Sequence, residues 1–151
     1  MFFGEGAIKQ RGSITGGLLF AWQCRKGGSQ KMILYFSATG NGKYIAEQIA
    51  EKTDEKCMSI VDCICEDKYC FSNEKIFGMV VPTYFWRLPR IVAEYLGKLR
   101  IENCGYTFFL ASYGTTTGEA GSMAKKIMAH NGQNFDAYYS VIMPDTWTPV
   151  F

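Results

Sequence analysis

The sequence predicts an α/β domain built on a parallel β-sheet. From Met32 onward, short apolar runs alternate with segments of helical spacing, which is typical of strand–helix–strand units. The runs are apolar at most positions, as expected of strands that are buried on both faces. At 151 residues, with 48% hydrophobic and 20% charged residues, the chain suits one soluble globular domain.

Five apolar runs are predicted as strands. Each is short and is bounded by residues that favour turns, and Pro82 and Pro144 end the third and the fifth. The five runs are residues 32–36, 58–61, 76–81, 106–112 and 135–143.

Three segments are predicted as helices. Residues 44–52 have apolar side chains at helical spacing, and residues 89–99 begin with a proline at the first helical position. Residues 118–129 precede Gly132, which stands where a helix stop is expected. Residues 62–74 are polar, and their pattern leaves a short helix and a loop both open. Right-handed crossovers place helices on both faces of such a sheet.

One element, a helix after the fifth strand, is missing from the predicted set. After the fifth strand only residues 144–151 remain, which is too few for a closing helix. Part of one sheet face should therefore lack a cover, an exposure that soluble monomers usually avoid. Two explanations stay open: the chain is a fragment of a longer protein, or a partner, such as the second copy in a homodimer, supplies the cover.

Residues 1–31 differ from the rest in composition. They are glycine-rich, have no convincing period and carry a net charge of +4, which leaves −2 for residues 32–151. We expect a leader or disordered segment at 1–31, followed by one domain at 32–151. The mildly acidic domain gives no nucleic-acid footprint, and no run reaches the roughly 18 apolar residues that span a membrane. The six cysteines lack a secreted-scaffold pattern, so we expect reduced thiols and a cytoplasmic location.

A loop rich in glycine and hydroxyl side chains joins the first strand to the first helix. It reads Phe36-Ser37-Ala38-Thr39-Gly40-Asn41-Gly42-Lys43. Ligands of open parallel sheets bind beyond the carboxyl ends of the strands, and a helix N-terminus there offers free N–H groups to an anion. The loop therefore predicts a phosphate site, with a capped helix start that binds no ligand as the alternative.

Two other phosphate-binding patterns do not match. The Walker pattern needs glycine at Ser37 and a hydroxyl residue at Tyr44, and the dinucleotide pattern needs glycine at Ile45. The sequence therefore argues against nucleotide hydrolysis and against a dinucleotide fingerprint at this loop.

The stretch from Ile33 to Ala46 resembles the flavodoxin signature, an apolar strand followed by [ST]-x-T-G-x-[ST] and a helix. It most resembles the flavodoxin half of bacterial flavodoxin–ferredoxin fusion proteins, and the resemblance runs from Met32 to about Trp147. It implies a flavodoxin-like three-layer sandwich with five parallel strands in the order 2-1-3-4-5. It also implies flavin mononucleotide (FMN), whose phosphate would be held by Ser37, Thr39, Gly40, Asn41, Gly42 and Lys43. Gly42 departs from the family, which often has a hydroxyl there, and weaker binding is the expected cost.

Two further loops follow the third and fourth strands and should lie at the same edge of the sheet. A flavin ring needs flat apolar walls and backbone donors for its polar edge. The resemblance implies that Tyr84 or Trp86 covers one face of the ring, with Tyr113 near the other, and Asp145 and Trp147 are expected within reach of the site; the alternative is that these aromatics pack against the sheet or form a protein interface. The residues predicted for these loops are Pro82, Thr83, Tyr84, Phe85, Trp86, Ser112, Tyr113, Gly114 and Gly118.

No catalytic or metal-binding residue is predicted. The spacing of Cys63, Cys65 and Cys70 matches no common zinc or iron–sulfur pattern, and the ferredoxin cysteine run is absent. His130 is the single histidine, so no triad of the hydrolytic type can be assembled.

Three functions remain open at this point. The first is an FMN-dependent electron-transfer module, whose partner would be a redox protein or a ferredoxin domain. The second is an FMN-dependent oxidoreductase, namely a reductase of quinone or free flavin that takes electrons from NAD(P)H. The third is a flavin-free interaction domain, because a fold alone does not fix a function.

Overall fold

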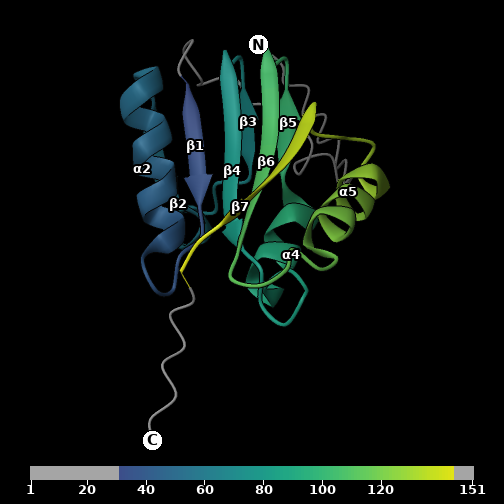
Figure 1. Cartoon of the computed structure of the whole chain (residues 1–151). Coiled ribbons are helices and arrows are strands. Elements are labelled where there is room, and N and C mark those ends of the chain that lie inside the picture. The colour runs from purple at the N-terminus through teal and green to yellow at the C-terminus, as the bar shows by residue number, and fades with distance from the viewer. Residues whose placement is uncertain (1–30, 145–151) are drawn as a thin grey trace, which may run out of the picture.

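The structure is a computed structural model, and it describes residues 31–144. Its centre is a five-stranded parallel sheet with the strand order β2-β1-β4-β6-β7 (Figure 1). Counted along the chain within this sheet, that is the order 2-1-3-4-5, so the predicted α/β class and topology are confirmed. The strands are β1 (Met32–Tyr35), β2 (Lys56–Ser59), β4 (Ile76–Pro82), β6 (Tyr106–Tyr113) and β7 (Ala137–Ile142).

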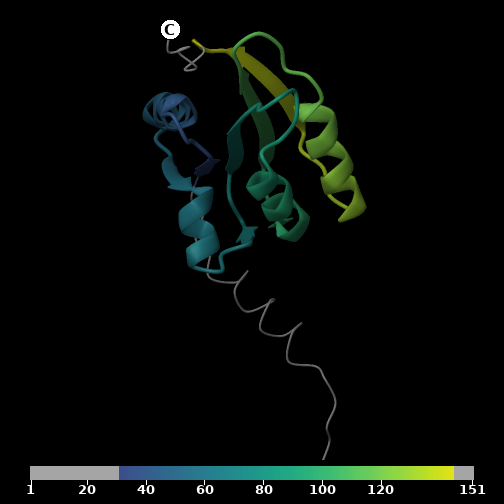
Figure 2. The same ribbon diagram turned by 90° about the horizontal axis from the view of Figure 1, so that it is seen from below.

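Helices cover the two faces of the sheet unequally. Among the described residues, α2 (Asn41–Thr53) is the one helix on one face, whereas the other face carries α3 (Ile60–Cys65), α4 (Arg90–Lys98) and α5 (Ala120–His130) (Figure 2). The three predicted helices correspond to α2, α4 and α5, with ends that differ by a few residues. The three-layer sandwich is therefore present.

The core has two parts because strand side chains alternate between the faces. Leu34, Met79 and Phe109 point into the larger part, beneath α4 and α5. Ile33 and Val80 point into the smaller part, beneath α2, with Ala46 and Ala50 of that helix. Burying such a side chain fully contributes about 1.5–3 kcal/mol, so the larger cluster supplies most of the hydrophobic stabilisation.

The face that carries α2 is open over β6 and β7. Tyr106 and Tyr139 are 38% and 53% exposed there, and their hydroxyl groups share a hydrogen bond of 2.9 Å. Phe108 fills part of the gap by lying across Gly78, where an added Cβ would sit 2.3 Å from its ring. In the described part of the chain, the expected exposure of one sheet face is thus present.

Three short elements were not specified by the sequence pattern. The region left open between helix and loop contains most of α3 and the strand β3 (Cys70–Ser72), which pairs in parallel with β5 (Arg100–Glu102). Ser59 caps α3 by accepting a hydrogen bond from the Val61 N–H at 3.2 Å. Each of these elements has six residues or fewer, which is too short for a periodic signal.

Among residues 31–144, none of the helices is both long enough and apolar enough to cross a bilayer.

Candidate cofactor-binding site

Three loops meet at the carboxyl edge of the sheet, because all five strands run in the same direction (Figure 1). They follow β1, β4 and β6, and they surround a cavity of about 110 Å³ that opens to solvent. The lining residues are Ser37, Ala38, Thr39, Asn41, Gly42, Pro82, Thr83, Tyr84, Ser112, Tyr113, Gly114, Met143 and Pro144.

The loop after β1 presents the bare N-terminus of α2. Gly40 is the N-cap residue, in a left-handed conformation with φ 102°, and no side chain caps the helix. The first intrahelical bond runs from the Tyr44 N–H to the Gly40 carbonyl at 2.9 Å, so the N–H groups of Asn41, Gly42 and Lys43 precede it. Ser37 Oγ accepts the Gly40 N–H at 3.0 Å and fixes the turn. These N–H groups and the helix dipole suit an anion.

Gly42 is required by packing. An added Cβ would lie 2.4 Å from the Phe36 carbonyl oxygen and 3.3 Å from Ser37 Cβ. Because the nearest obstacle is backbone, a side chain at this position would force the loop away from the end of β1. The hydroxyl that the flavodoxin signature often has here is therefore excluded by this local geometry.

The loop after β4 is a tight turn in which Tyr84 and Arg87 exchange two backbone hydrogen bonds of 2.9 Å. Phe85 and Trp86 occupy its centre with φ values of 47° and 62°. Non-glycine residues in this region cost about 1–3 kcal/mol each unless the surroundings hold them. Gly118 helps to hold the turn, since an added Cβ there would lie 2.4 Å from both Trp86 Cβ and the Trp86 carbonyl oxygen.

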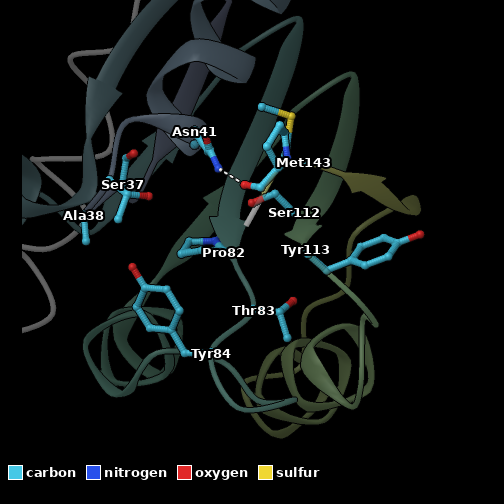
Figure 3. Close-up of a pocket in the computed structure, with 13 residues that line it drawn as sticks. Ser37, Ala38, Asn41, Pro82, Thr83, Tyr84, Ser112, Tyr113 and Met143 are labelled. Atoms are coloured by element: carbon cyan, nitrogen blue, oxygen red, sulfur yellow. Dashed lines mark hydrogen bonds between the residues drawn. The ribbon is translucent and has the colours of Figure 1, made fainter. Parts of the chain in front are cut away.

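Tyr84 points from this turn toward the loop after β1 (Figure 3). Its ring lines the cavity, and its hydroxyl lies near the backbone of Ala38. Burial raises the pKa of the Tyr84 hydroxyl, and a hydrogen bond with the Ala38 backbone partly opposes this rise. The hydroxyl is therefore neutral at physiological pH, and the ring forms a flat wall beside the helix N-terminus.

Thr83 carries a polar atom that suits a ligand. Its hydroxyl oxygen is buried and lacks a hydrogen-bond partner among the residues that the structure describes. Its backbone N–H donates to the Ser112 carbonyl at 2.8 Å, which fixes the residue between the second and third loops. An unpartnered hydroxyl in a cavity lining offers one hydrogen bond to a polar group of a bound molecule.

Met143 and Pro144 also line the cavity, although neither was predicted as a site residue. The Met143 N–H donates to the Tyr113 carbonyl at 2.8 Å and continues the pairing of β6 with β7. Asn41 Nδ2 donates to the Pro144 carbonyl at 3.1 Å across the cavity (Figure 3). The two residues that were predicted to reach the site from beyond β7, Asp145 and Trp147, lie outside the described residues.

The predicted site residues divide into two groups. The structure brings together around the cavity Ser37, Thr39, Asn41, Gly42, Pro82, Thr83, Tyr84, Ser112, Tyr113 and Gly114. The remaining ones do not line the cavity: Gly40, Lys43, Phe85, Trp86 and Gly118. Phe85 is 90% exposed, and the ring of Tyr113 extends away from Ser37 and Asn41 (Figure 3). Tyr84 is thus the aromatic residue best placed as a wall.

Metal binding has no support in the described part of the chain, where no group of three or more His, Cys, Asp or Glu residues is placed to hold an ion.

Comparison with solved structures finds the same fold in proteins of low sequence identity. The flavodoxin of Megasphaera elsdenii, solved in its two-electron reduced state, is 18% identical, with a TM-score of 0.59 over 78% of this chain and 90% of that one. A flavoprotein of Lactobacillus acidophilus in complex with FMN is 16% identical, with a TM-score of 0.55 over 75% and 93%. Rubredoxin oxygen:oxidoreductase of Desulfovibrio gigas is 18% identical, with a TM-score of 0.58 over 85% of this chain and 34% of that one.

Sequence comparison identifies the family. Among curated proteins, none matches the sequence. Residues 32–151 match the flavodoxin domain family, and this range covers the sheet, its helices and the three loops. The chain therefore belongs to the flavodoxin domain family.

Proposed function

We propose that this protein is an FMN-binding electron-transfer module. The observation that carries the proposal is the bare N-terminus of α2 at one end of a cavity whose other walls come from the loops after β4 and β6. An anionic ester and a flat ring joined by a polar chain match such a site. The FMN complex of the Lactobacillus acidophilus flavoprotein, which shares this fold, supports the same ligand.

The phosphate would be held by backbone N–H groups of residues 41–43 and by the Thr39 hydroxyl, with Ser37 fixing the turn. Tyr84 would give the ring a wall, and the Thr83 hydroxyl would donate to a polar atom of the flavin. When bound, FMN supplies the redox chemistry, and the protein sets the potential through stacking and hydrogen bonds.

The composition of the lining favours a carrier over a reductase. Among the lining residues that the structure describes, none is Asp, Glu, His, Lys, Arg or Cys, so this part of the cavity presents no side chain suited to proton transfer near neutral pH. A carrier of electrons needs none, because the flavin itself performs the redox step. A reductase would also need a second pocket for NAD(P)H beside the ring.

Kinetics with the FMN-loaded protein test this choice. The photoreduced protein should reduce a stoichiometric amount of cytochrome c, and the oxidised protein should show no steady-state oxidation of NADH or NADPH, with or without quinone. Sustained NAD(P)H oxidation would instead establish the reductase. A protein that takes up no FMN would establish the flavin-free interaction domain.

The partner is proposed as a redox protein or a ferredoxin domain, because a one-cofactor carrier needs a donor and an acceptor. A second copy of the chain is proposed for the open face over β6 and β7, where Tyr106 and Tyr139 are exposed. Sedimentation of wild type and Tyr139→Lys tests this: a dimer that the variant dissociates supports it, and a monomeric wild type contradicts it.

A cytoplasmic location is also proposed. Cys57, Cys63, Cys65 and Cys104 are free thiols, as a reducing compartment requires. Cys70 is disulfide-bonded, which departs from the expectation of reduced thiols throughout. Fractionation of cells that express the chain, with thiol labelling of the soluble fraction, tests the location.

A further inference from the structure

One hydrogen bond joins two residues that line the cavity from different elements. Asn41 is the first residue of α2, and its side-chain amide donates to the Pro144 carbonyl, which lies just beyond the end of β7, at 3.1 Å (Figure 3). The two residues are 103 positions apart in sequence, and both line the cavity. The bond therefore joins the N-terminus of α2 to the part of the cavity wall that follows β7.

The end of β7 is otherwise held from one side only. The Met143 N–H donates to the Tyr113 carbonyl of β6 at 2.8 Å, and β7 is the edge strand of the sheet. Within residues 31–144, the Asn41 amide supplies the restraint from the opposite side. Without it, the chain at Met143 and Pro144 would be fixed by the sheet edge alone.

The two parts of Asn41 face different targets. Its backbone N–H belongs to the group that precedes the first intrahelical bond of α2, and such groups bind anions. Its side-chain amide is engaged with Pro144 and points across the cavity (Figure 3). Contact with the phosphate therefore requires only the backbone of Asn41, and the side chain can have a second role.

We infer that Asn41 is a positioning residue, whose side chain holds Pro144 and Met143 in place as the wall that the non-phosphate part of FMN contacts. This inference rests on the proposed binding of FMN. Asn41 would thus make two separate contributions. Its backbone N–H binds the phosphate together with those of residues 42 and 43, and its side chain holds the cavity wall that follows β7.

Substitution of Asn41 by alanine tests the separation. The variant keeps every backbone N–H and loses the bond to Pro144. We expect the Kd for FMN to rise about three- to tenfold, which is the usual range for one neutral hydrogen bond. The Kd for riboflavin should rise by the same factor, while the inhibition constant of inorganic phosphate as a competitor of FMN stays unchanged.

Asn131→Ala is the matched control. Asn131 Nδ2 donates to the carbonyls of Leu96 and Gly97 at 3.1 and 3.0 Å, so it makes the same type of bond between α5 and α4, away from the cavity. Its loss should lower the free energy of unfolding and leave the Kd for FMN unchanged. Asn41→Asp, which cannot donate and adds a negative charge, should weaken FMN and inorganic phosphate together.

The outcomes are distinguishable. An unchanged Kd for FMN in Asn41→Ala overturns the inference, and so does a loss that inorganic phosphate shares, because the side chain would then act on the phosphate. A wild-type protein that binds no FMN overturns the proposed function itself. A loss confined to FMN and riboflavin, with phosphate inhibition intact, supports the positioning role.

Discussion

Gly42 lies against the carbonyl oxygen of Phe36, so closely that a Cβ at this position would be 2.4 Å from that oxygen. This contact joins the first turn of α2 to the end of β1 and sets the shape of the loop between them. It also explains a departure from the family pattern: a hydroxyl side chain could add a hydrogen bond to a phosphate, but this backbone has no room for it.

Gly42→Ser is therefore expected to weaken the protein. We expect a loss of about 1–3 kcal/mol in the free energy of unfolding, as is typical when atoms are forced into a packed site, together with weaker FMN binding. Gly121→Ala is the matched control, because Gly121 is likewise the second residue of a helix, α5, and an added Cβ there meets nothing within 4 Å. Urea unfolding should show that this variant is as stable as wild type or more stable. A Gly42→Ser protein with unchanged stability and tighter FMN binding would refute the packing argument.

Ser37 should matter for FMN binding through the turn that it fixes. Its Oγ accepts the Gly40 N–H at 3.0 Å, and Ser37→Ala leaves that N–H without this partner. We expect the Kd for FMN to rise about five- to tenfold, measured by quenching of flavin fluorescence. Ser122→Ala removes an exposed hydroxyl that donates to the carbonyl of Glu119, the N-cap residue of α5, and it should leave the Kd unchanged. Equal effects of the two variants would contradict a specific role for Ser37.

The aromatic residues after β4 should differ sharply in their effect. Tyr84 lines the cavity, whereas Phe85 is 90% exposed and does not line it. Tyr84→Ala should raise the Kd for FMN about tenfold, because stacking of a flat ring on an aromatic wall contributes about 0.5–1.5 kcal/mol beyond the area that it buries. Phe85→Ala should change it less than twofold. The reverse order in fluorescence titrations would mean that the turn rearranges around the flavin.

Glu74 should make stability depend on pH. This residue is buried, and its Oε2 has no hydrogen-bond partner within the described residues. Burial raises the pKa of its carboxyl above the ordinary value of 4.5, although Lys68 partly opposes the rise. The contribution of Glu74 to stability is thus fully present below pH 4.5 and is lost as the pH rises through the raised value.

Glu74→Gln should accordingly raise the Tm near pH 7, and the gain should vanish as the pH falls toward 4. Glu51→Gln, at an exposed position of α2, serves as the control and should show no such gain. A Tm difference for Glu74→Gln that grows on acidification would contradict the sign of this argument. Neither substitution should affect FMN binding. Glu74 lies just before the start of β4, whereas the cavity lies at the other end of that strand.

Local patterns in the sequence were sufficient for most of the fold. The apolar run of β1, followed by a glycine-rich loop and an amphipathic helix, predicted both the first strand and the position of the cavity. Elements that depend on distant contacts were missed. β3 and β5 have three residues each and form by pairing Phe71 with Ile101, a partner that no local pattern identifies.

The same limit applies to the candidate site. Loops that follow strands could be assigned to one edge because parallel topology requires it. The places of Met143 and Pro144 depend on the register of β7 against β6 and on the side-chain bond from Asn41, and neither is visible in the sequence. The left-handed turn at Phe85 and Trp86 could not be predicted either, because bulky residues rarely adopt it.

The most direct test of the account is a titration of the purified wild-type chain with FMN and with riboflavin, which lacks the phosphate. We expect one FMN per chain, with an affinity at least about tenfold above that of riboflavin, because charge-assisted hydrogen bonds from the N–H groups of α2 act on the phosphate alone. Equal affinities for the two flavins, or no binding of either, would contradict the assignment of the α2 N-terminus as a phosphate site.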